Sequence, residues 1–111
     1  MHEFKVDVEA LLLQAQKRIA QLQAELATAQ IEKARAEAST TEADDALERL
    51  NEQQSRRKWD SDVAFKTRLV LAVRNRLRVK ERKIRIRTSR IMRKLKVSKT
   101  EELKLMESVL R

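Results

Sequence analysis

The chain has 111 residues, with 26 Lys and Arg against 17 Asp and Glu, and it contains no Gly, Pro, Cys or Tyr. The absence of Cys excludes disulfides, thiolate metal sites and thiol nucleophiles. Without Gly, and with its single His at position 2, the sequence argues against a Ser-His catalytic pair and a phosphate-binding glycine loop, so we predict no enzyme, no cofactor, no metal site and no small-molecule substrate.

The charge is divided unevenly along the chain. Residues 1–54 carry 6 Lys and Arg against 11 Asp and Glu, a net charge of −5, whereas residues 55–111 carry 20 against 6, a net charge of +14. Such asymmetry indicates that one half meets protein and the other meets a polyanion. We therefore expect an acidic, Ala- and Gln-rich long helix over 1–54, a docking motif over 55–66 and a basic tail over 67–111.

Residues 8–50 predict one long helix, because Ala, Gln, Glu, Lys and Leu favour helices and no Gly or Pro interrupts the run. Apolar or small residues recur at heptad spacing on one face of this helix. They are Val8, Leu12, Ala15, Ile19, Leu22, Leu26, Ala29, Ala36, Ala43, Leu47 and Leu50. Lys33 and Thr40 occupy core positions in the middle of this weak coiled-coil seam. We expect an all-α, elongated chain whose long N-terminal helix is ordered by a partner.

Residues 67–111 predict a basic, partly disordered tail with a short terminal helix. Residues 66–96 include 14 Lys and Arg and a single acid. The apolar residues within 77–86 fit a strand as well as a helix, and their periodicity leaves both conformations open. Near the end, Ser98 or Thr100 can cap a helix that continues to the last residues.

Residues 55–66 predict a docking motif, because they place the only Trp and one of the two Phe beside carboxylates and basic residues. As the start of a helix, Asp60 would be the N-cap and Asp62 would favour the positive end of the helix dipole. As an extended segment, the motif would place both aromatic residues and Val63 on one side. In either conformation the aromatic side chains need a surface to bury against. The alternative is that Trp59 packs on the preceding helix or stays exposed.

The motif resembles the signature of the Cwf/Cwc fifteen family of pre-mRNA splicing factors, which reads roughly Arg-Arg-Trp-Asp-Asp-Asp-Val-Val-Phe-Lys-Asn. The matching run is Arg56-Arg57-Lys58-Trp59-Asp60-Ser61-Asp62-Val63-Ala64-Phe65-Lys66. Upstream, Asp7-Val8-Glu9-Ala10-Leu11-Leu12 is similar to the family's Asp-x-x-Ala-Leu-Leu helix. The resemblance covers about residues 7–66, and the basic tail does not match.

The resemblance implies a nuclear, non-enzymatic component of the spliceosome that is associated with the nineteen complex. Such a protein would tie large spliceosomal subunits together near the catalytic small nuclear RNAs, with small nuclear RNA as a further partner. The residues that the resemblance implies as partner-binding are Arg56, Arg57, Trp59, Asp60, Asp62, Val63, Phe65 and Lys66.

Three alternatives stay open. The first is a generic coiled-coil protein with a basic nucleic-acid-binding tail, whose arginines would contact phosphates without selecting bases. The second is a helix on an anionic membrane surface, which would be poorly anchored because no aromatic residue follows Phe65. A membrane span is not expected, since no apolar run approaches the roughly 20 residues that it requires. The third is that residues 67–111 come from a shifted reading frame.

Overall fold

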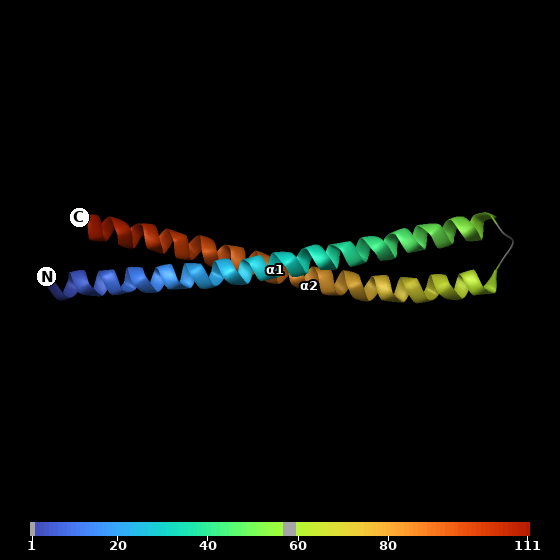
Figure 1. Ribbon diagram of the computed structural model, residues 1–111, viewed down its shortest axis with the longest axis horizontal. Helices are drawn as coiled ribbons and strands as arrows, with labels where there is room; N and C mark the ends of the chain where they lie inside the picture. Colours follow the sequence, from blue (N-terminus) through green and yellow to red (C-terminus); the bar gives the residue numbers. More distant parts are fainter. Residues whose placement is uncertain (1, 57–59) are drawn as a thin grey trace. The chain divides into compact units, whose positions relative to one another are not determined.

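The computed structural model describes residues 2–56 and 60–111, with side chains described for residues 7–56 and 60–111. It contains two long helices, α1 (His2–Arg56) and α2 (Ser61–Leu110), of 55 and 50 residues (Figure 1). The described residues include no strand. The all-α prediction is confirmed.

The predicted helix over residues 8–50 is confirmed, and α1 extends beyond it in both directions. Hydroxyl-bearing residues in its middle do not interrupt it. The Thr40 hydroxyl donates a hydrogen bond to the carbonyl oxygen of Ala36 at 3.0 Å, and the Thr41 hydroxyl donates to that of Glu37 at 2.9 Å. These bonds satisfy the hydroxyl groups within the helix, which continues through both residues.

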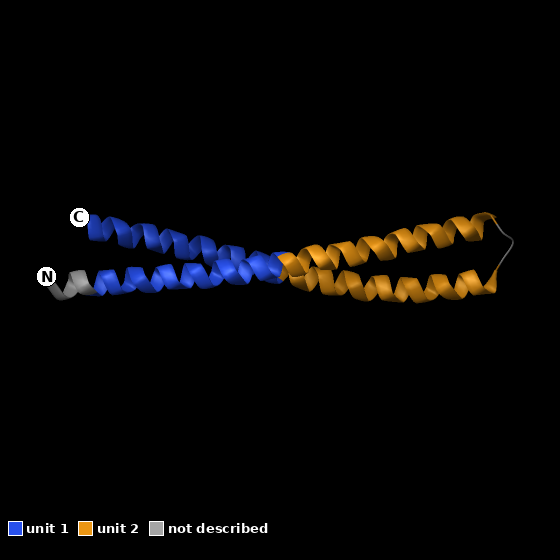
Figure 2. Ribbon diagram, in the orientation of Figure 1, with its two compact units in different colours: residues 1–30, 87–111 blue, residues 31–86 orange. Residues whose placement is uncertain are grey.

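The chain divides into two compact units, coloured separately in Figure 2. Unit 1 comprises residues 1–30 and 87–111, and unit 2 comprises residues 31–86. Each unit pairs a stretch of α1 with an antiparallel stretch of α2. In unit 1 a buried apolar cluster joins the two helices. It consists of Ile19, Leu22 and Leu95, with Leu26 and Ile91 packed against it.

Every predicted seam position of α1 is buried or half-buried, and so are Lys33 and Thr40. The heptad spacing therefore identified the packed face of α1 correctly. The expectation that another molecule orders this helix was wrong, because α2 of the same chain packs against it. Residues 67–111, which were expected to form a partly disordered tail, instead belong to the helix that packs against α1.

The structure corrects the prediction for residues 67–111, which belong almost entirely to α2. Apart from Ala64, the residues that α2 buries or half-buries follow an unbroken heptad spacing, which we call the α2 seam. They are Val63, Thr67, Val70, Arg74, Leu77, Glu81, Ile84, Thr88, Ile91, Leu95, Ser98, Glu102, Leu105 and Val109. Such a regular seam favours a genuine sequence over a shifted reading frame.

The structure decides two further points in the C-terminal half. Of the two conformations left open for residues 77–86, the helix is confirmed and the strand was wrong, since this stretch is helical throughout. Ser98 and Thr100 do not cap a terminal helix, because both lie inside α2. Ser98 is only 5% exposed in the α2 seam, and the Thr100 hydroxyl donates to the carbonyl oxygen of Lys96 at 3.0 Å.

Candidate partner-binding site

The docking motif spans the point where α2 begins, and Asp60 caps that helix. An Asp60 carboxylate oxygen accepts a hydrogen bond from the backbone N–H of Asp62 at 3.0 Å, and the Asp60 carbonyl accepts one from the N–H of Ala64, also at 3.0 Å. This is the geometry of an N-cap residue. Asp62 lies in the first turn, where a negative charge is favoured by the helix dipole. For residues 60–66, which the structure describes, the helical alternative is thus confirmed and the extended one was wrong.

The motif residues that follow the cap point in different directions. Val63 is 8% exposed and is the first residue of the α2 seam. Phe65 is 57% exposed, and Lys66 is also exposed. Asp60 and Val63 therefore stabilise the chain's own fold, while Phe65 and Lys66 remain accessible to a partner.

The basic and aromatic residues before the cap are only partly covered by the structure. Arg57 and Trp59 lie outside the described residues. Arg56 is the last residue of α1, is exposed, and lines a groove of unit 2 together with Asp44 and Glu48. Of the basic residues before the cap, Arg56 is therefore the one whose position the structure describes, as an exposed side chain at the end of α1.

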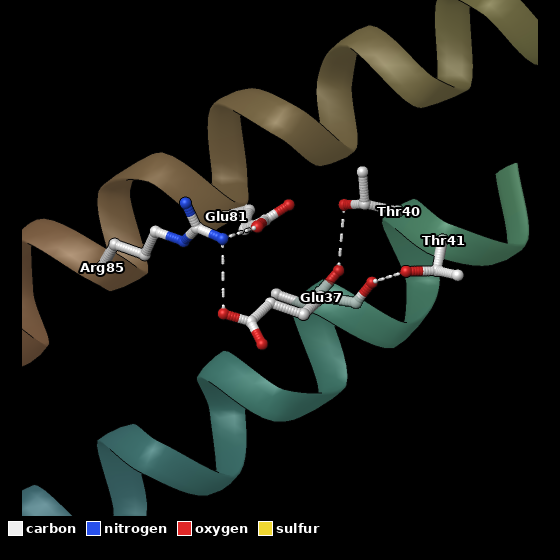
Figure 3. Close-up of polar contacts among 6 residues, drawn as sticks. Glu37, Thr40, Thr41, Glu81 and Arg85 are labelled. Atoms are coloured by element: carbon white, nitrogen blue, oxygen red, sulfur yellow. Dashed lines mark hydrogen bonds and ion pairs between the residues drawn. The ribbon is translucent and has the colours of Figure 1, made fainter. Parts of the chain in front are cut away.

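Ion pairs link the two helices within unit 2. The guanidinium of Arg74 lies 3.7 Å and that of Arg78 3.6 Å from the same carboxylate oxygen of Asp44. Figure 3 shows Arg85 of α2 between two carboxylates, at 2.8 Å from Glu81 and 3.4 Å from Glu37 of α1. The acidic character of α1 therefore neutralises only part of the charge of α2.

Most basic side chains of α2 are left without a carboxylate partner. Among the residues that the structure describes, ten exposed Lys and Arg between positions 66 and 96 make no ion pair. They are Lys66, Arg68, Arg76, Lys80, Arg82, Lys83, Arg90, Arg93, Lys94 and Lys96. Six of them lie in unit 2 and four in unit 1, so the stretch of α2 in each unit presents a basic, solvent-facing surface that can attract a polyanion.

A second line of apolar side chains on α2, which we call the outer stripe, was missed at the sequence level. It consists of Phe65, Leu69, Ala72, Val79 and Ile86, all exposed. These residues recur at heptad positions of their own, offset by two residues from the α2 seam, and so lie on roughly the opposite side of the helix. The spacing of Phe65, Leu69 and Ala72 is the signal that could have revealed it.

Two kinds of site find no support in the described part of the chain. No group of three or more His, Cys, Asp or Glu side chains there could hold a metal ion. Neither helix, over its described residues, includes a stretch long and apolar enough to cross a membrane.

Comparisons of the chain with protein-family models, curated proteins and solved structures found no match.

Proposed function

We propose that the protein is a non-enzymatic coiled-coil scaffold that binds nucleic acid through the basic surface of α2. The observation that carries this proposal is the set of exposed lysines and arginines on α2 that no carboxylate of the described chain neutralises. Binding through such side chains is electrostatic, depends strongly on salt and selects phosphates over bases.

The densest part of this surface lies in unit 1. Arg90, Arg93, Lys94 and Lys96 are all exposed within seven consecutive positions, and that stretch of α2 includes no acid. Side chains three and four positions apart lie on neighbouring parts of a helix surface. Four cations close together can contact successive phosphates of one strand, and the counterions that they release favour binding.

The test is the affinity of the full chain for a labelled single-stranded RNA over a range of salt concentrations. We expect the variant with Arg90, Arg93, Lys94 and Lys96 all changed to Gln to bind at least about tenfold more weakly and with a smaller salt slope. The matched control changes the exposed Lys17, Arg18, Arg35 and Arg49 of α1 to Gln, which removes the same charge. An equal loss in both variants would show that net charge alone, and not this surface, determines binding.

We propose further that the scaffold acts in the nucleus as a spliceosomal component, in contact with large proteins of the nineteen complex and with small nuclear RNA. The resemblance of residues 56–66 to a splicing-factor signature supports this assignment. So does the exposure of Phe65 and Lys66 directly after the Asp60 cap. Because Asp60 and Val63 have roles within the fold, Phe65 and Lys66 are the described residues of the motif best suited to contact a partner.

Purification of the tagged chain from nuclear extract tests this assignment. Nineteen-complex proteins and small nuclear RNAs should co-purify with the wild type and be lost in a Trp59→Ala/Phe65→Ala variant. Recovery of heterogeneous RNA alone, in equal amounts with both forms, would reject the spliceosomal role and leave the general nucleic-acid-binding scaffold.

A further inference from the structure

The outer stripe is organised as a second heptad seam. From Phe65, positions four and seven residues further are Leu69 and Ala72, and the pattern continues with Val79 and Ile86. Scattered exposed apolar residues are normal on any protein surface. Here four large ones, between 47% and 57% exposed, share one side of one helix within unit 2. A helix with apolar residues at heptad spacing on two sides can pack against two partner helices at once.

The charged residues that flank the outer stripe after Phe65 are all positive. Arg76 and Lys83 occupy the two heptad positions of the stripe that are not apolar. Lys66, Arg68, Lys80 and Arg82 flank it, and all six are exposed and make no ion pair within the described residues. Glu81, the one acid of α2 between positions 63 and 86, lies in the α2 seam and pairs with Arg85. The stripe therefore presents an apolar centre in a positive field.

We propose that the outer stripe binds an amphipathic helix of another protein, one whose apolar seam is flanked by Asp and Glu. Apolar residues at heptad spacing fit the apolar seam of such a helix, and carboxylates at its flanking positions complement the basic rim. The result would be a three-helix arrangement in which α2 lies between α1 and the partner. This surface is distinct from the cluster at residues 90–96 proposed to bind RNA.

A second copy of this chain is a poor occupant. Between residues 31 and 56, α1 exposes a single large apolar side chain, Ile31, so its outward face could not fill the stripe. A second α2 would bring its own basic rim against that of the first, and like charges facing each other are unfavourable. Nucleic acid is also a poor occupant of the stripe itself, because it would leave Leu69, Val79 and Ile86 against phosphates.

The proposal is tested with the full chain and a synthetic peptide of three heptads that carries Leu at its core positions and Glu at the flanking positions. The stripe variant is Leu69→Gln/Val79→Gln. The matched control is Leu13→Gln/Val97→Gln, because the exposed fractions of these two residues, 54% and 59%, resemble those of Leu69 and Val79, 53% and 55%. We expect at least about a tenfold loss of peptide affinity in the stripe variant and no loss in the control. Circular dichroism should show unchanged helicity in both variants.

Two outcomes with the peptide would overturn the proposal: equal affinity in the stripe and control variants, or equal binding of a peptide that carries Gln in place of Glu. Two outcomes without the peptide would also overturn it. These are a dimer in sedimentation experiments that depends on the stripe, and binding to phosphatidylserine vesicles in place of the peptide. RNA affinity measured on the same variants separates this inference from the proposed function. The stripe variant should retain it, since the residues at 90–96 are intact.

Discussion

The guanidinium of Arg74 lies 3.7 Å from the carboxylate of Asp44, at a position where a coiled coil normally buries an apolar side chain. Arg74 belongs to the α2 seam, and its side chain is only 23% exposed. Its Nε is buried without a hydrogen-bond partner among the described residues. A buried polar group that lacks a partner lowers stability, and a partly buried ion pair recovers only part of that loss.

Replacing Arg74 with Leu should therefore stabilise the helix pair of unit 2. We expect the free energy of unfolding to rise by about 1 kcal/mol, because a buried charge gives way to an apolar side chain at a seam position. Urea denaturation followed by circular dichroism measures the change. Arg82→Leu serves as the control, since Arg82 is exposed, and should change stability by less than about 0.5 kcal/mol. A destabilised Arg74→Leu protein would contradict the argument.

Asp44 accepts ion pairs from both Arg74 and Arg78, yet its side chain is 43% exposed. Exposed pairs of this kind are weak and are screened by salt. Asp44→Asn should lower the free energy of unfolding by less than about 1 kcal/mol at low salt and by almost nothing at high salt. A loss that persists at high salt would mean that Asp44 acts through packing or hydrogen bonding.

Leu22 should be among the most sensitive apolar positions. It is 3% exposed and lies in the buried cluster of unit 1 with Ile19 and Leu95. Leu22→Ala should lower the free energy of unfolding by about 2–4 kcal/mol, because it removes buried methyl groups and leaves a cavity. Leu13→Ala is the matched control. Because Leu13 is 54% exposed, this variant should lower the free energy of unfolding by less than about 0.5 kcal/mol. Thermal and urea unfolding of both variants measures these changes. Similar losses of stability in the two variants would mean that Leu22 is not part of the core.

Asp60 should contribute to stability through its cap. Asp60→Ala removes the carboxylate that accepts the Asp62 N–H, so we expect a loss of about 1 kcal/mol. Asp60→Asn retains an acceptor oxygen and should recover most of that stability, which Ala cannot do. If Asn and Ala destabilise the protein equally, the negative charge matters more than the hydrogen bond.

The sequence predicts α1 far better than α2, and the reason is physical. Along α1 most of the large apolar residues occupy one face, so a single heptad register emerges. Along α2 two lines of apolar residues are superimposed. Leu77 and Ile84 belong to the seam, whereas Val79 and Ile86 belong to the outer stripe, and together they imitate the alternation of a strand. Polar side chains at seam positions, such as Arg74 and Glu81, obscured the register further.

The candidate site was predictable to a similar, partial extent. Asp60 was recognisable as a cap because capping depends on local residue types. The different environments of Val63 and Phe65 depend on which face of α2 meets α1, and that follows only from the tertiary pairing. The set of unpaired basic residues also required the structure, since sequence separation alone does not indicate which arginines reach a carboxylate of α1.

Because α1 pairs with α2 inside one polypeptide, formation of this helix pair does not depend on the concentration of the protein. Two-chain coiled coils dissociate on dilution, because their stability depends on the concentration of each strand. Here the second strand is covalently attached, so its effective concentration is set by the short connection between Arg56 and Ser61 and not by expression level. A single molecule can thus form its complete binding surface, even where only one copy is incorporated into an assembly.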